Sequence, residues 1–120
     1  DWRFDTADAV AAGALHGRLI LGPKVPAGAW TAAGLAALGL TLRRDGDAVA
    51  EGRGANALGG PLAALAHLAA ALAAEPEAPA LAAGEVISTG TLTDALPIRP
   101  GETWRADFDP PLGPLEVAFA

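Results

Sequence analysis

A glycine-rich stretch in the middle of the chain holds the residues best suited to binding a charged ligand. The stretch GRGANALGGPL begins at Gly52 and runs into a segment with helical spacing. Gly52, Gly54 and Ala57 satisfy the G-x-G-x-x-[G/A] pattern of dinucleotide-binding turns, with the acidic Glu75 about twenty residues further on. Arg53 has little bulk around it and could hold a carboxylate through two parallel hydrogen bonds. A surface ion pair is the alternative role for this arginine.

The surroundings of this stretch argue against a dinucleotide site. Such a site joins a strand directly to a helix, so that the helix N-terminus faces the pyrophosphate. Here the preceding run is half of a hairpin predicted at Asp45-Gly46, and the helix is predicted to begin only at Pro61. Glycines that permit unusual backbone angles, or a close approach of other groups, explain the pattern better.

A second candidate is the stretch STGT, residues 88–91, which follows a strand-like run. Thr89, Gly90 and Thr91 offer hydroxyl and backbone N–H donors that could line an anion pocket. An ordinary hydroxyl-rich turn explains the same residues about as well.

The remaining candidates are acids near the start of the chain and the two histidines. Asp1, Asp5 and Asp8 could bring carboxylates together on one helical turn, although the helix dipole also favours acids there. His16 precedes a predicted helix end, where an imidazole can pair with free carbonyl groups. His67 is interpreted as structural or solvent-facing, because neither histidine has a second ligand at metal-binding spacing.

Helices and short extended runs are predicted to alternate along the chain and to position these residues. Asp45-Gly46 predicts a two-residue hairpin, and proline is accepted in the first turn of the helix that starts at Pro61. The predicted helices are 5–16, ending before Gly17, and the one from Pro61, ended by Pro76 and Pro79. The predicted extended runs are 18–23, 39–44, 47–51, 84–90, 95–108 and 112–120, with 24–39 irregular and 73–83 a surface connection.

Composition limits the class of protein. The chain has 120 residues, of which 52% are apolar and 5% aromatic, and it carries a net charge of −6 without any cysteine. One α+β domain over residues 1–120 is expected. The acidic balance argues against a nucleic-acid partner, and the lack of a run of ~18 apolar residues argues against a membrane span, so a cytoplasmic protein is expected. The chain lacks methionine and opens on Asp1, which favours a processed, trimmed or partial chain.

Three motifs in order resemble the C-terminal part of the 2-keto-4-pentenoate hydratase family, within the fumarylacetoacetate hydrolase superfamily. They are the GRGANALGGPL segment, the loop GEVISTGTL from Gly84 and the Pro100-Gly101-Glu102 turn. The opening DWRFDTADAVAAGALHG is also similar to a family segment that begins Asp-Trp. The resemblance covers nearly the whole chain, and the three motifs together are more specific than any one alone.

This resemblance implies a mixed β-roll or barrel-like sheet with a few short helices, usually in an oligomer. It implies a bound Mg²⁺ or Mn²⁺ that holds a small 2-oxo acid and stabilises an enolate while water adds to a conjugated double bond. Sister enzymes decarboxylate or hydrolyse carbon–carbon bonds. The implied substrate-binding residues are Arg53, Gly54, Thr89, Gly90 and Thr91, with Asp8 as a supporting catalytic carboxylate.

The departures from the family pattern are equally informative. Relatives supply metal carboxylates from a Glu-x-Glu motif and a further acid, all upstream of the segment that begins here at Asp1, so none of those ligands is expected in this sequence. Many relatives have Ala-Asp-Asn-Ala where this chain has Ala11-Ala12-Gly13-Ala14. Two explanations follow: a piece of a longer enzyme that associates with an N-terminal segment or forms a homo-oligomer, or a non-catalytic subunit that keeps the fold. The first is favoured.

Overall fold

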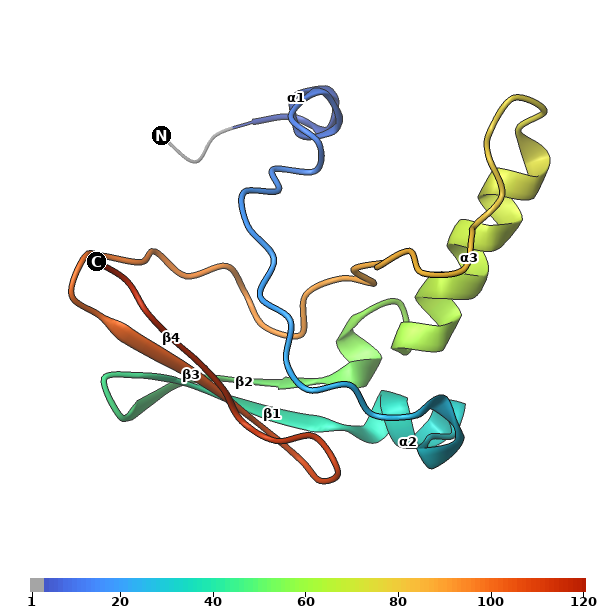
Figure 1. The fold of residues 1–120 in the computed structure, drawn as a ribbon. Helices are drawn as coiled ribbons and strands as arrows, with labels where there is room; N and C mark the ends of the chain where they lie inside the picture. The colour runs from blue at the N-terminus through green and yellow to red at the C-terminus, as the bar shows by residue number, and fades with distance from the viewer. Residues whose placement is uncertain (1–3) are drawn as a thin grey trace.

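The computed structural model describes residues 4–120, which form an α+β structure around one sheet (Figure 1). The predicted α+β class is confirmed. Asp1 and its neighbours Trp2 and Arg3 lie outside the described residues. In chain order the elements are the helix α1 (Thr6–Ala11), the short 3₁₀ turn η1 (Ala27–Ala29), α2 (Ala32–Ala37), β1 (Gly39–Arg44), β2 (Asp47–Arg53), the 3₁₀ turn η2 (Gly54–Asn56), α3 (Pro61–Ala74), β3 (Thr103–Phe108) and β4 (Leu115–Ala118).

The sheet has the strand order β2-β1-β3-β4, and every neighbouring pair is antiparallel. The described residues therefore form an antiparallel sheet with two edges, in contrast to the mixed, barrel-like sheet that the family resemblance implied. The Asp45-Gly46 hairpin is confirmed: both turn residues have positive φ, 51° and 92°, as the tight turn between twisted strands requires. A shift of register between Leu42 and Arg43 adds a bulge to β1 and β2.

The sheet has two chemically distinct faces, because alternate residues of a strand point to opposite sides. The strand register places polar and charged residues on one side, here called the charged face: Thr41, Arg43, Glu51, Arg53, Arg105, Asp107 and Glu116. The opposite, apolar face carries Leu40, Leu42, Ala50, Trp104, Ala106, Phe108, Leu115 and Val117.

Several expectations for the helices and extended runs need correction. The helix predicted over 5–16 ends at Ala11, because Gly13 and the two residues after it adopt left-handed φ angles. The segment 24–39 contains α2, whose N-cap Thr31 accepts a hydrogen bond from the Gly34 N–H at 3.0 Å. The runs 18–23 and 84–90 are not strands, since neither pairs with the sheet. Residues 95–102 are also outside the strands, although Gly101 and Glu102 form backbone hydrogen bonds with Phe119; β3 and β4 do form within 95–108 and 112–120.

Helix α3 begins at Pro61 and ends at Ala74, as predicted. Together with η2 it makes a 21-residue stretch, Gly54–Ala74, that is long and apolar enough to cross a membrane by length and composition, with a hydropathy of 1.6. This stretch differs from the expectation that the sequence lacks a run of ~18 apolar residues. Positive φ angles from Leu58 to Gly60 interrupt it. The continuous helix of 14 residues is only about 21 Å long, against about 30 Å for a bilayer core.

Little of this chain is buried. In the described part, the apolar residues below a tenth exposed are Leu38, Ala57 and Trp104, at 8%, 4% and 6%. The chain exposes 8865 Å² of surface at a mass of 11.9 kDa, whereas a compact monomer of that mass exposes about 5,950 Å². Twelve large apolar side chains of residues 4–120 are exposed, among them Leu19, Ile20 and Leu21 of the extended run before α2.

Candidate functional site

The glycines of the Gly-Arg-Gly turn allow other backbone segments to approach closely. A Cβ atom added to Gly52 would lie 2.8 Å from the carbonyl carbon of Leu92, and one added to Gly54 would lie 2.9 Å from that of Leu35. Both distances are shorter than real Cβ contacts. The Gly54 N–H also donates to the Leu38 carbonyl at 2.9 Å. The turn is therefore a packing junction, in agreement with the close-approach interpretation of its glycines.

Arg53 points to the opposite side from these two glycines and lines a hollow on the charged face. The hollow has a volume of about 430 Å³ and is called the arginine hollow below; it is lined by Gly39, Leu40, Thr41, Glu51, Gly52, Arg53, Asn56, Asp107 and Asp109. Arg53 is exposed and forms no ion pair with any residue in 4–120. Its guanidinium is therefore available to an anion, and within residues 4–120 the surface ion pair considered from the sequence does not form.

Of the three carboxylates that line the arginine hollow, those of Asp107 and Asp109 have hydrogen-bond partners, whereas that of Glu51 has none among the described residues. Asp107 accepts hydrogen bonds from Arg105 Nε at 2.7 Å and from Arg43 Nε at 2.9 Å. The bond from Arg105, followed by the bond from Arg43, holds the pKa of Asp107 below its ordinary value. Asp109 accepts from the Gly39 N–H at 2.7 Å. Asp107 is thus a charged structural group at neutral pH.

The second predicted loop lies beside this hollow rather than inside it. Thr91 lines a neighbouring space of about 460 Å³, called the threonine hollow, together with Glu51, Asn56, Leu92, Thr93 and Asp94. Glu51 and Asn56 line both spaces. Gly90 has a φ of 127°, and a Cβ there would lie 3.5 Å from the Ala57 Cβ. Thr89 is partly buried and lines neither hollow.

Asn56 is the residue of this region that sequence reasoning missed. Its Nδ2 donates a hydrogen bond to the Leu92 carbonyl oxygen at 2.8 Å, which joins the Gly-Arg-Gly turn to the loop that contains Thr91. The position follows the glycine motif directly. The signal in the sequence was a single carboxamide in a turn that is apolar apart from Arg53.

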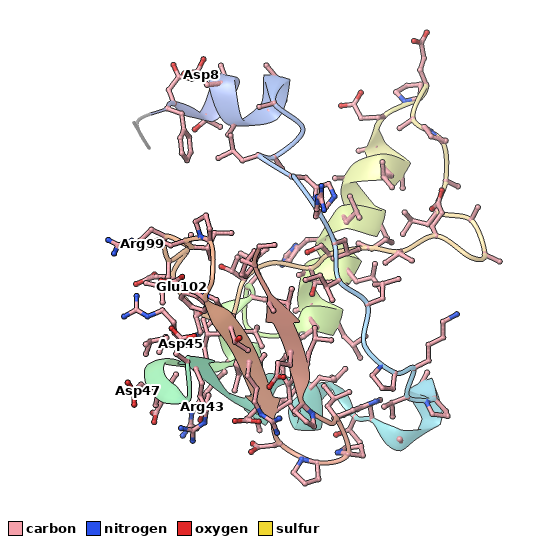
Figure 2. The ribbon with its side chains drawn as sticks, turned by 60° about the vertical axis from the view of Figure 1, so that its left-hand side comes forward. Asp8, Arg43, Asp45, Asp47, Arg99 and Glu102 are labelled. Atoms are coloured by element: carbon pink, nitrogen blue, oxygen red, sulfur yellow. The ribbon has the colours of Figure 1, made fainter. Side chains whose placement is uncertain are left out.

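Asp8 lies on α1, apart from both hollows. Figure 2 shows Asp8 on this helix, away from the sheet that carries Arg43. Its carboxylate accepts a hydrogen bond from the Asp5 N–H at 3.2 Å while Asp5 accepts from the Asp8 N–H at 2.9 Å, so the two acids form a capping box. Asp5 and Asp8 thus stabilise the start of α1. A catalytic role for Asp8 stays a prediction.

The residues in 4–120 do not fit a divalent metal by themselves. No three side chains of the ligand types His, Cys, Asp and Glu lie together there in a way that could hold an ion. His16 and His67 are both exposed. Asp107 and Asp109 of the arginine hollow are already bonded to arginine or backbone donors.

Comparisons with known proteins bear directly on the motifs of this region. The family model described as fumarylacetoacetate (FAA) hydrolase C-terminal matches residues 1–119. The 2-keto-4-pentenoate hydratase of Paraburkholderia xenovorans (strain LB400) is 35% identical over 111 residues, which cover 91% of this chain and 39% of the relative. The 4-oxalocrotonate decarboxylase of Pseudomonas sp. (strain CF600) is 35% identical over 102 residues, or 85% and 37% of the two chains.

A solved structure extends this likeness to the fold. The 4-oxalocrotonate decarboxylase from Pseudomonas putida G7, complexed with magnesium and adipate, matches with a TM-score of 0.62 and 37% identity over 72% of this chain and 32% of that one. A second structure of that enzyme is complexed with calcium and acetate. The chain spans about two fifths of the length of its curated relatives. The resemblance to the hydratases is confirmed, and the chain belongs to the fumarylacetoacetate hydrolase family, whose C-terminal region it matches.

Proposed function

We propose that this chain supplies one wall of the substrate pocket of a hydratase-like lyase that acts on a small 2-oxo or 2-hydroxy-dienoic acid. The observation that carries the proposal is Arg53, a guanidinium without an ion-pair partner in the described residues, in a hollow on the charged face. Relatives at 35% identity are named as a hydratase and a decarboxylase of small oxo acids, which supports this substrate class.

Each residue of the wall has a distinct part in this proposal. Arg53 binds the substrate carboxylate through two N–H donors, a geometry that lysine cannot reproduce. Thr91 offers a hydroxyl group from the adjoining threonine hollow, and Gly54 and Gly90 allow the backbone packing that holds the two loops in place. Thr89 supports the loop without lining a hollow. Asp8 is a supporting carboxylate in this proposal. Because α1 lies apart from both hollows, Asp8 reaches the pocket only if further polypeptide packs beside α1.

A divalent cation and further polypeptide complete the proposed enzyme. Magnesium or calcium is present in the related decarboxylase structures, and we propose Mg²⁺ or Mn²⁺ here with ligands outside residues 4–120, which cannot hold it alone. The chain exposes 8865 Å², about 2,900 Å² more than expected for a compact monomer. This excess supports association with an N-terminal enzyme segment or in a homo-oligomer, and we propose a cytoplasmic, catabolic setting for the enzyme.

A hybrid enzyme tests the proposal. This chain replaces the matched residues of the Paraburkholderia xenovorans hydratase, and the hybrid is mixed with Mg²⁺ and 2-hydroxypenta-2,4-dienoate. We expect the dienol absorbance to fall with the hybrid and to stay constant with the 120-residue chain alone. A folded hybrid that turns over neither this compound nor 4-oxalocrotonate would sink the proposal and favour a non-catalytic subunit.

Decarboxylation is the second candidate, because two relatives at similar identity are named 4-oxalocrotonate decarboxylase. The same hybrid separates the two reactions. Release of CO₂ from 4-oxalocrotonate without loss of the dienol would favour the decarboxylase. Cleavage of a carbon–carbon bond in an acylpyruvate, without either of these signals, would favour the hydrolases of the superfamily.

A further inference from the structure

We propose that Asn56 is a positioning residue that fixes the loop of residues 89–94 relative to Arg53, so that the two hollows receive one acid substrate. The inference deepens the proposed function and rests on it for the identity of the substrate. Asn56 lies at the end of η2, three positions after Arg53, and it lines both the arginine hollow and the threonine hollow.

The hydrogen bond from Asn56 holds a segment of the chain that has little other hydrogen bonding. Leu92, its acceptor, lies 36 positions further along the chain. Among the described residues, no backbone–backbone hydrogen bond involves residues 86–98, and the bond from Asn56 Nδ2 to the Leu92 carbonyl is the single hydrogen bond to that segment. A segment without regular structure is therefore attached to the sheet by one side-chain donor.

Packing at two glycines fixes the direction of this attachment. The carbonyl of Leu92 lies directly over Gly52, where a Cβ would come within 2.8 Å of the carbonyl carbon. Two residues earlier, Gly90 packs against Ala57, which is 4% exposed. Asn56 thus donates to a carbonyl that is already pressed against the Gly-Arg-Gly turn. We therefore expect removal of the donor to loosen the loop around Thr91 without changing Arg53 or its strand.

The chemistry of this contact requires a carboxamide or another donor. An ionised carboxylate at position 56 would face the Leu92 carbonyl oxygen and repel it, although its shape is nearly the same as that of asparagine. A protonated carboxyl group would donate again. Asn56→Asp therefore removes the bond at neutral pH without changing side-chain volume, and Asn56→Gln keeps a carboxamide at an exposed position that has room for one more methylene.

The first measurement is the backbone order parameter of the Thr91 and Thr93 amides, from ¹⁵N relaxation of the 120-residue chain. For Asn56→Asp we expect the order parameters to fall from about 0.85 to below about 0.6 at pH 7, and to recover toward wild type at pH 4. Asn56→Gln should stay close to wild type. Thr93→Val is the matched control, since Thr93 lines the same hollow and forms no hydrogen bond. Unchanged order parameters in Asn56→Asp would overturn the inference.

The second measurement is steady-state kinetics of the hybrid enzyme with 2-hydroxypenta-2,4-dienoate. We expect KM to rise at least tenfold in Asn56→Asp with a smaller change in kcat, and Asn56→Gln to restore most of the affinity. A loosened loop with an unchanged KM in an active hybrid would refute the positioning role and leave the proposed function intact. A hybrid that is inactive with Asn56 in place would refute the proposed function instead, and the order parameters alone would then decide whether Asn56 holds the loop.

Discussion

The two ends of the sheet differ in how their charged groups are satisfied. At the hairpin end, Asp45 accepts a hydrogen bond from the Thr103 N–H at 2.8 Å, and Glu102 accepts from Trp104 Nε1 and from the Arg99 N–H, each at 2.9 Å. Figure 2 shows Asp45, Arg99 and Glu102 gathered at this end. At the opposite end Arg53 has no such partner in the described residues. Asp45 and Glu102 at the hairpin end thus have hydrogen-bond partners, whereas the guanidinium of Arg53, at the candidate site, has none among the described residues.

Trp104→Ala tests the hairpin end and carries the largest expected effect. Trp104 is 6% exposed, and its indole lies against Arg44, 5.9 Å from the ring centre, and donates to Glu102. Truncation leaves a large cavity, so we expect a loss of about 3–5 kcal/mol in the free energy of unfolding, measured by denaturant titration followed by circular dichroism. Trp30→Ala, at a less buried tryptophan, is the control. An equal loss in both variants would contradict a core centred on Trp104.

Arg53→Met tests the site end, where activity and not stability should change. Loss of a bidentate, charge-assisted contact costs about 1.5–3 kcal/mol, so kcat/KM of the hybrid enzyme should fall about 10- to 150-fold. The unfolding free energy should stay within about 0.5 kcal/mol of wild type. Arg18→Met is matched, because Arg18 is also exposed and unpaired in residues 4–120 but lines neither hollow. Equal kinetic effects in the two variants would remove Arg53 from the site.

Gly54→Ala tests whether the glycine turn serves packing, as the structure indicates. The added Cβ would meet the carbonyl of Leu35 within α2, so the helix must shift. Overpacking of this kind costs about 1–3 kcal/mol, again measured by denaturant titration. Gly28→Ala is the control, since a Cβ at Gly28 meets nothing within 4 Å. If Gly54→Ala is as stable as Gly28→Ala, the close approach of α2 is wrong.

The parts of the fold that the sequence predicted are those set by local rules. The Asp45-Gly46 turn requires two positive φ angles, and Pro61 is suited to the first turn of a helix, so the hairpin and α3 were both predicted. The strand predicted at 18–23 is wrong: its apolar residues suggested a buried strand, but in the structure the run is exposed and pairs with no described strand. Helix α2 was missed because Gly34 and the flanking prolines obscured the Thr31 cap.

The candidate site was predictable in part for the same reason. Arg53 stands out locally among glycines, and family motifs add Thr91. The contact between Asn56 and the Leu92 carbonyl joins positions 36 residues apart through a backbone atom, which leaves no trace in residue types. Likewise, the division of Arg53 and Thr91 between two adjoining hollows follows from the alternation of β2 and the path of the later loop.

Glu102→Gln carries the smallest expected effect and tests the hairpin end through its pH dependence. The hydrogen bond from Trp104 holds the pKa of Glu102 below its ordinary value of 4.5, assisted by the bond from Arg99 and by Arg44. A carboxyl group whose pKa is lowered by folding stabilises the folded state above its unfolded pKa, and this contribution is lost as the pH falls through the folded pKa. The wild-type Tm should therefore decline below about pH 4.5, and the decline should be shallower in Glu102→Gln.

Asp107→Asn separates this effect from the other paired acid of the sheet. Its pKa is lowered from an ordinary value of 3.8 by Arg105 and then by Arg43, so its contribution begins to be lost below about pH 3.8, against about pH 4.5 for Glu102. Glu102→Gln should flatten the upper part of the acid decline and Asp107→Asn the lower part, in Tm measured across pH 2.5–6 by calorimetry. Parallel profiles for wild type and Glu102→Gln would mean that the carboxylate is not held by Trp104. The pairing of Glu102 at the hairpin end would then rest on the Arg99 N–H and on Arg44, whose Nη1 lies 4.0 Å from Glu102 Oε1.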